Sequence, residues 1–93
     1  MSTIGAVQRR IKKVEGFEVR FKYPHNRKDV YDNKIGLPQY PYTVMARNAW
    51  NITGWKNQRF KPNYPGFDVV VYYKDGTVCN GNCRLANIRD TYL

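Results

Sequence analysis

Apolar residues in the first part of the chain recur at helical spacing. Ile4, Val7, Ile11 and Val14 follow one another at intervals of three or four residues, which places them on one face of a helix. Basic and polar residues fill most of the remaining positions. A helix this short is marginal in water unless its apolar face packs against another element. We therefore expect residues 1–14 to form a basic amphipathic helix or a basic arm that leads into the first strand.

The clearest strand pattern follows, between residues 15 and 23. Its apolar residues occupy every second position: Phe17, Val19, Phe21 and Tyr23. Charged residues stand between them, so one face of the strand should enter the core while the other faces water. The water-facing positions include Arg20 and Lys22. Pro24 should end the strand, because proline has no backbone N–H for the sheet.

Residues 24–41 form a long connection that proline, glycine and asparagine interrupt repeatedly. Loops of this length without secondary structure are uncommon in compact domains and are usually functional or mobile. The segment combines Arg27 and Lys28 with Tyr31 and Tyr40. Two interpretations stand side by side: an irregular cover whose tyrosines pack on the core, or a binding loop that exposes them.

From residue 42 to residue 60 the apolar spacing becomes helical again. Three apolar residues share one helical face: Met45, Ala49 and Ile52. Thr43 is a candidate N-cap, while Gly54 weakens a continuous helix by about 1 kcal/mol relative to alanine. We expect one bent helix or two short helices, the second beginning near Asn51 or Thr53. Both tryptophans of this segment should serve the core.

The last third of the chain predicts a hairpin and a short helix. Residues 67–73 are rich in valine and tyrosine, and Val69, Val70 and Val71 make the middle apolar on both faces, which is typical of a central strand. The Lys-Asp-Gly sequence at 74–76 is a tight hairpin signal. A third strand should run from 77 to about 79. Further on, Leu85, Ile88 and Tyr92 recur at helical spacing.

Together these elements predict a small α+β domain. Its sheet would have three strands, mainly antiparallel, with two or three short helices packed on one face. A chain of 93 residues suits one domain, in which residues 15–93 form the α+β core. The other face of the sheet would stay partly open and carry Arg20 and Lys22.

Charge adds a functional expectation to this architecture. Sixteen lysines and arginines against seven acidic residues give a net charge of +9. The excess is concentrated in residues 1–28, and a basic segment is the electrostatic footprint of a nucleic-acid binder, although high charge also keeps proteins soluble. Cations neutralise phosphates and aromatic rings stack on unpaired bases. The predicted binding residues are Arg9, Arg10, Lys12, Lys13, Arg20, Lys22, Arg27, Lys28, Tyr31 and Tyr40.

The same composition also fits a protein-binding module. A basic surface docks on an acidic protein, and tyrosine and arginine are enriched in interface hot spots. The alternative is therefore a small inhibitor or adaptor of the kind that phages and mobile elements encode. Nothing in the sequence separates DNA from RNA, a single strand from a duplex, or a monomer from a dimer. The chain has no apolar run long enough for a signal core or a membrane span, which predicts a cytoplasmic protein.

Catalytic and metal chemistry find little support in the sequence. The single histidine, His25, lies in a polar loop, the acidic residues are scattered, and no phosphate-binding or dinucleotide motif occurs. We expect no enzymatic activity, no cofactor and no metal. Cys79 and Cys83 flank an Asn-Gly-Asn turn. Reduced thiols are the expectation, with a disulfide across the turn or a shared metal site as alternatives.

Overall fold

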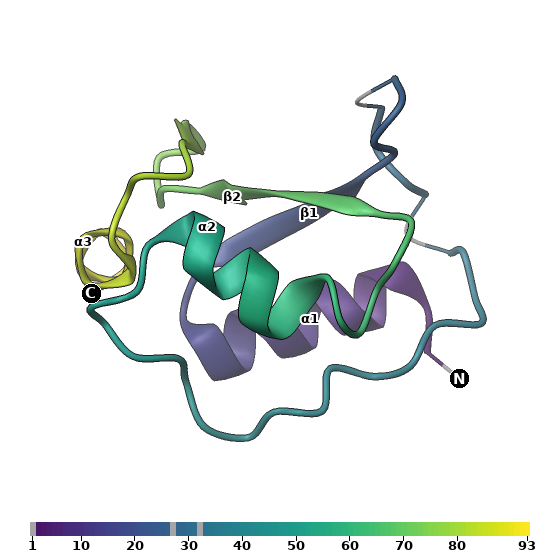
Figure 1. Cartoon of the computed structure of the whole chain (residues 1–93), viewed down its shortest axis with the longest axis horizontal. Coiled ribbons are helices and arrows are strands. Elements are labelled where there is room, and N and C mark those ends of the chain that lie inside the picture. Colours follow the sequence, from purple (N-terminus) through teal and green to yellow (C-terminus); the bar gives the residue numbers. More distant parts are fainter. Residues whose placement is uncertain (1, 27, 32) are drawn as a thin grey trace.

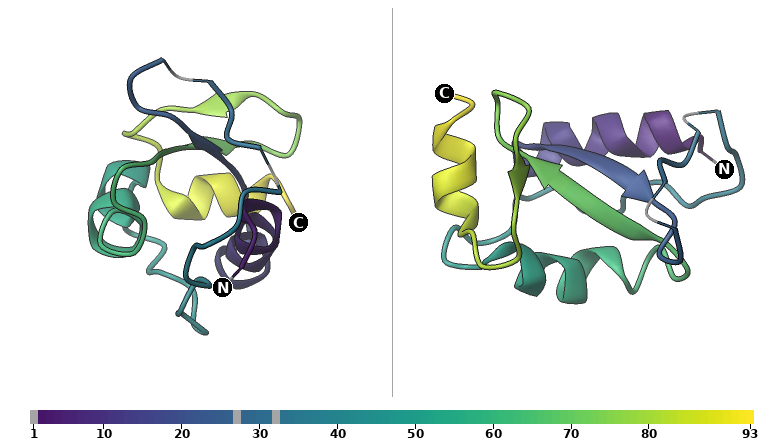
Figure 2. Two further views of the ribbon diagram at one scale, coloured as in Figure 1. Left: turned by 90° about the vertical axis from the view of Figure 1, so that its right-hand side faces the viewer. Right: turned by 90° about the horizontal axis from the view of Figure 1, so that it is seen from above.

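The computed structural model describes residues 2–26, 28–31 and 33–93 and has the predicted α+β architecture (Figure 1). In chain order the elements are α1 (Ile4–Glu15), β1 (Glu18–Lys22), α2 (Ile52–Trp55), the π-helical segment η1 (Lys56–Phe60), β2 (Asp68–Tyr72), β3 (Val78–Cys79) and α3 (Leu85–Asp90). The strands form an antiparallel sheet in the order β1-β2-β3, so the valine-rich strand is central, as predicted. The helices lie on one side of this sheet (Figure 2).

The N-terminal segment forms a capped helix, α1. Of the two structures expected for residues 1–14, the amphipathic helix is therefore correct and the extended arm is not. The hydroxyl of Thr3 accepts a hydrogen bond from the backbone N–H of Ala6 at 3.1 Å. At the other end Gly16 adopts a left-handed conformation with φ of 84°, and its N–H donates to the Lys12 carbonyl at 2.9 Å. The chain reverses at this glycine, so Glu15 ends the helix and the strand begins only at Glu18.

The register of β1 against β2 divides the side chains between two faces. Val19 pairs with Val71 and Phe21 with Val69, and all four are buried against the helices. The buried rings contact one another edge to face, with centroids 5.3 Å apart for Phe17 and Trp55 and 4.9 Å for Phe21 and Phe60. The residues between them lie on the opposite face: Glu18 pairs with Tyr72, Arg20 with Val70 and Lys22 with Asp68.

The prediction of a helix over residues 42–51 is wrong. All of these residues are described, and they form an irregular segment in which Met45 is exposed and Thr43 caps no helix. The reason is that side chains from distant elements bind the backbone of this segment. The N–H of Ala46 donates to the Glu15 carboxylate, and Arg89 donates to the Ala46 carbonyl. These contacts replace the bonds that a helix would make internally.

The alternative of two short helices, the second beginning near Asn51 or Thr53, is correct for the second helix. Asn51 is the N-cap of α2, and its side chain accepts a hydrogen bond from the N–H of Gly54 at 2.8 Å. Trp55 is fully buried, while Trp50 is half-buried and packs against the core. The helical path then continues into η1, which buries Phe60.

The long connection leaves the end of β1 and runs past α1 on the side away from the sheet (Figure 1). The N–H of Ile4 donates to the Lys34 carbonyl at 2.9 Å, and Leu37 pairs with Ser2. The N–H of Val30 donates to the carbonyl of Phe21 at 3.0 Å, so the connection also covers the end of β1. Among the residues described, no helix has the length and apolar character needed to cross a membrane.

Candidate nucleic-acid interface

The solvent face of α1 carries a row of cations. Arg9, Lys12 and Lys13 are exposed, because the apolar residues of this helix turn toward the core. Arg10 lies on another flank and donates to the carbonyl of Tyr42 at 3.4 Å, so it ties the long connection to the helix. The helical pattern of the sequence thus brings three of the four predicted helix cations to one exposed face.

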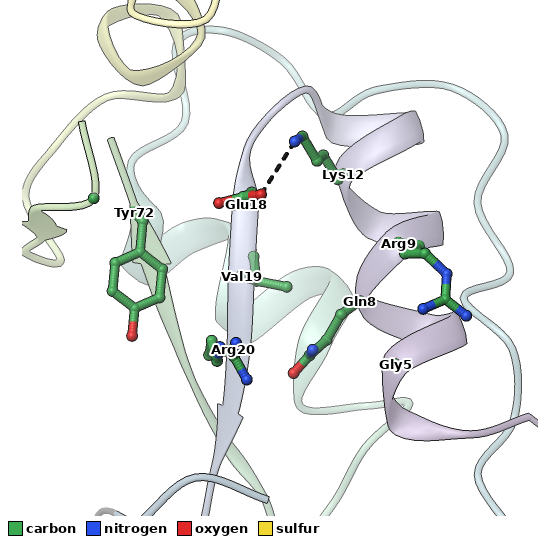
Figure 3. A pocket seen from close by; sticks show the side chains of 9 residues that line it. Gly5, Gln8, Arg9, Lys12, Glu18, Val19, Arg20 and Tyr72 are labelled. Atoms are coloured by element: carbon green, nitrogen blue, oxygen red, sulfur yellow. Dashed lines mark hydrogen bonds and ion pairs between the residues drawn. The ribbon is translucent and has the colours of Figure 1, made fainter. Parts of the chain in front are cut away.

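The neighbouring strand completes this basic region. The side-chain oxygen of Gln8 accepts a hydrogen bond from the N–H of Phe21 at 2.9 Å, which holds α1 beside the edge of β1. Between the two elements lies a depression of about 350 Å³ (Figure 3). Its polar and aromatic lining comes from both elements and from β2: Gln8, Arg9, Lys12, Glu18, Arg20 and Tyr72. We call the four cations Arg9, Lys12, Lys13 and Arg20 the α1–β1 surface.

Carboxylates neutralise part of the predicted basic region. Lys12 Nζ lies 3.1 Å from Glu18 Oε1, and both side chains are more than half exposed. Lys22 forms an ion pair with Asp29, and the Lys22 hydrogen bond is the main cause that lowers the pKa of Asp29. Arg9 and Lys13 form no ion pair with any residue in the described part of the chain. Most of the positive charge that carboxylates leave uncompensated on the α1–β1 surface therefore comes from residues of α1.

The remaining predicted residues are divided between the loop and the core. Lys28 is exposed beside the end of β1, Tyr31 is 80% exposed in the long connection, and Arg27 lies outside the described residues. Tyr40 requires a correction. Its ring is buried in the core, where its hydroxyl donates to Glu15 at 2.5 Å and accepts from the indole N–H of Trp55 at 3.1 Å. A ring in that position has no free face on which a base could stack.

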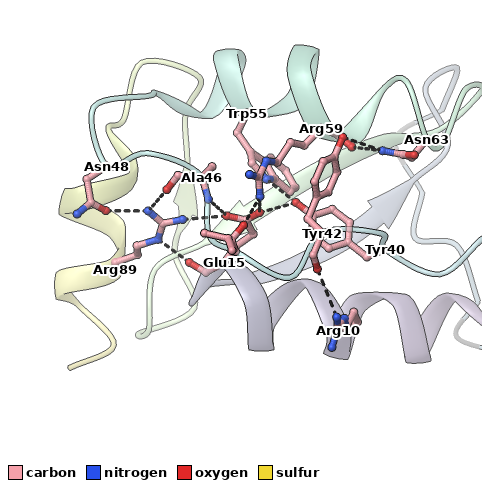
Figure 4. Close-up of polar contacts among 11 residues, drawn as sticks. Arg10, Glu15, Tyr40, Tyr42, Ala46, Asn48, Trp55, Arg59, Asn63 and Arg89 are labelled. Carbon is pink, nitrogen blue, oxygen red and sulfur yellow. Dashed lines mark hydrogen bonds and ion pairs between the residues drawn. The ribbon is translucent and has the colours of Figure 1, made fainter.

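The partner of Tyr40 is a fully buried carboxylate, which the sequence analysis placed at the start of a strand (Figure 4). Glu15 accepts hydrogen bonds from Arg59 at 2.8 Å and Arg89 at 2.9 Å, and from the N–H of Ala46 at 2.8 Å. Arg89 is only 8% exposed and also donates to the carbonyls of Glu15 and Ala46. Burial raises the pKa of Tyr40, and its hydrogen bond to Glu15 acts in the same direction. This cluster fixes the segment at 42–48 and holds Arg59 and Arg89 away from the α1–β1 surface.

Three polar or aromatic residues that line the depression were not among the predicted binding residues: Gln8, Glu18 and Tyr72. Glu18 and Tyr72 are cross-strand partners, and the hydroxyl of Tyr92 bridges their backbones. It accepts from the N–H of Glu18 at 3.0 Å and donates to the carbonyl of Tyr72 at 2.5 Å. Strand alternation indicates that Glu18 shares a face with Arg20, but only the register between β1 and β2 brings Tyr72 beside them.

The two cysteines lie apart from the residues that line this depression. Both thiols are free; Cys79 is buried, and the sulfur of Cys83 lies 3.0 Å from the Tyr73 hydroxyl. Burial is the main cause that raises the pKa of Cys79 to about 11, so its thiol stays protonated at neutral pH. Within the described ranges, no three side chains of histidine, cysteine or acidic type gather in a way that would hold a metal ion.

Comparison with protein-family models, curated proteins and solved structures finds no significant match to this chain. The candidate site therefore rests on the geometry and charge of its own residues.

Proposed function

We propose that the chain binds nucleic acid without catalysis, through phosphate contacts to the α1–β1 surface. The observation that carries this proposal is the shared depression: Arg9, Lys12 and Arg20 come from two elements and line one hollow. Lys13 extends the row one helical turn beyond Arg9. Cations grouped in this way neutralise neighbouring phosphates and release the counterions that those phosphates hold.

The lining of the depression favours binding over chemistry. Among the described residues that line it, Glu18 is the only carboxylate, and none of them carries an imidazole or a thiol. General acid–base or nucleophilic catalysis needs a base held close to a reacting group. A site of arginine, lysine, glutamine and tyrosine offers hydrogen-bond donors and a ring face instead.

The ion pair between Lys12 and Glu18 does not remove Lys12 from the surface. Both side chains are more than half exposed, and ion pairs of this kind contribute about 0–1 kcal/mol. A phosphate that approaches Lys12 therefore competes with a weak contact. The pair of Lys22 and Asp29 lies next to the covered end of β1, so the proposal does not rely on Lys22.

Salt dependence tests the proposal directly. Four phosphate contacts predict a slope of log K against log salt of about −3.6 on duplex DNA and about −2.8 on a single strand. Fluorescence anisotropy with labelled single- and double-stranded DNA and RNA, between about 50 and about 200 mM salt, measures this slope. The single-strand value corresponds to a loss in affinity of about 50-fold over that range.

A matched pair of variants separates a local surface from general charge. Arg9→Glu with Lys13→Glu should weaken binding at least about 25-fold at about 100 mM salt, because two phosphate contacts are lost. Lys61→Glu with Arg84→Glu changes the net charge equally at two exposed cations outside the α1–β1 surface. This control should lose far less affinity.

Two results would contradict the proposal. If both double variants weaken binding equally, the attraction is a property of net charge and not of this surface. If no oligonucleotide binds even at low salt, the alternative of a protein-binding inhibitor or adaptor takes its place.

A further inference from the structure

We infer that the depression between α1 and β1 holds one unpaired nucleotide, so that the ligand is a single strand. This inference rests on the proposed function and makes it specific. The volume of about 350 Å³ falls at the lower end of the range for small-molecule sites, about 300–1,000 Å³, which suits a single nucleotide unit.

The surroundings of α1 argue against a duplex. An α-helix with its side chains is about 10–12 Å across, and the major groove of DNA is about 12 Å wide. A helix that enters this groove does so with one exposed face, and its neighbours must lie behind that face. Instead, Gln8 joins one flank of α1 to β1, and Arg10 joins another flank to the connection at Tyr42. Helix α1 therefore forms one side of the depression, and a flexible single strand can lie along it.

The side of the depression on β2 offers a ring for stacking. Tyr72 is half-buried and lies on the sheet face that the helices leave uncovered, beside Glu18 and Arg20 (Figure 3). Its backbone is fixed, because the hydroxyl of Tyr92 donates to its carbonyl. A ring attached to a central strand loses little freedom when a base stacks on it, and every base has a face that can do so.

The charges divide the depression into two ends. Glu18 and Lys12 lie at one end, while Arg20 and Gln8 lie toward the other (Figure 3). A phosphate should avoid the Glu18 carboxylate and contact Arg9 and Arg20. The base should then lie between Tyr72 and Glu18, whose carboxylate accepts hydrogen bonds.

This polarity predicts a preference among bases. Cytosine presents an exocyclic amino group, which a carboxylate binds, whereas thymine and uracil present a carbonyl acceptor at the same position. A carboxylate that meets an acceptor gains no hydrogen bond and repels it. We therefore expect oligo-dC to bind more tightly than oligo-dT of the same length.

The test compares three fluorescein-labelled probes of about 12 units: oligo-dC, oligo-dT and a duplex of mixed sequence. Anisotropy titrations at one low salt concentration should show oligo-dC binding at least about tenfold more tightly than the duplex. Tyr72→Leu should weaken binding of the single strands about tenfold, while Tyr72→Phe keeps the ring and the affinity. Tyr73→Leu changes the next tyrosine in the chain, which is also half-buried but does not line the depression, and serves as the control. Glu18→Gln should bring oligo-dC and oligo-dT to similar affinities, because an amide both donates and accepts.

The failures of the two proposals are distinguishable. If the duplex binds as tightly as the single strands, or if Tyr73→Leu weakens binding as much as Tyr72→Leu, the single-nucleotide site is overturned and phosphate binding remains. If none of the three probes binds, phosphate binding fails as well. Circular dichroism of each variant shows whether its sheet and helices are intact, and Tyr72→Phe distinguishes a loss of stacking from a loss of structure.

Discussion

Removal of the buried charge of Glu15 should destabilise this small domain strongly. It is fully buried and accepts hydrogen bonds from two guanidinium groups, Arg59 and Arg89. Glu15→Gln keeps the shape of the side chain and removes its charge. The variant leaves Arg89 buried without a counter-charge, and its amide group also turns a donor toward one of its former donors.

The size of the effect follows from the burial of the pair. Removing one partner of a buried ion pair costs about 3–5 kcal/mol. A chain of this length has a free energy of unfolding of about 5–15 kcal/mol, so the change removes a large fraction of the total. At about 4 °C or more per kcal/mol, the melting temperature should fall by at least about 12 °C.

Urea unfolding followed by tryptophan fluorescence measures this change. Urea carries no charge and does not screen the ion pairs, and buried Trp55 donates to Tyr40 within the same cluster. The matched control is Glu18→Gln, which removes an exposed carboxylate with one surface ion pair and should cost less than about 1 kcal/mol. If Glu15→Gln unfolds within about 1 kcal/mol of the unchanged protein, the cluster does not hold the fold together as argued.

Three further predictions follow from other contacts. A Cβ at position 81 would lie 2.4 Å from the hydroxyl oxygen of Thr53, so Gly81→Ala should cost about 1–3 kcal/mol in urea unfolding, and adding Thr53→Ala should recover most of it. Thr3→Ala removes the N-cap of α1 and should cost about 1 kcal/mol; an unchanged urea midpoint would show that the cap is dispensable. Because burial raises the pKa of Cys79 from 9.0 to about 11, the folded state favours the protonated thiol. The contribution of this protonation to the free energy of unfolding is complete below pH 9 and is lost as the pH rises toward 11. Cys79→Ala removes this contribution, so the melting temperature of the variant should fall less steeply at alkaline pH.

Patterns of apolar and polar residues within a short stretch of sequence were enough to predict the elements that pack an apolar face against the core. The helix at 4–15, the strands and the hairpin follow from spacing and turn residues that lie close together in the sequence. The segment at 42–51 does not, because its conformation is set by Glu15 and Arg89, which are far away in the chain. The helical spacing of Met45 and Ala49 has no counterpart in the structure.

The same distinction applies to the candidate site. The cations of α1 reach one exposed face because helical periodicity alone places them there. Tyr40 was assigned to the surface because a tyrosine in a polar loop gives no sign that a buried carboxylate will bind its hydroxyl. The position of Tyr72 opposite Glu18 depends on the strand register, which a single sequence does not specify. In the last helix, Arg89 follows Ile88 directly and so lies beside the apolar stripe, a position from which its charge can reach the core.

The contacts along the outer side of β1 have a consequence for self-association. Unpaired strand edges are templates on which another chain can add a strand. Here the N–H of Phe21 is bound by Gln8 and its carbonyl by Val30, while the N–H of Tyr23 donates to Lys28. At the opposite edge β3 extends over only two residues. The sheet therefore offers an incoming strand few backbone partners on either side, which protects a protein with a small core from edge-to-edge aggregation.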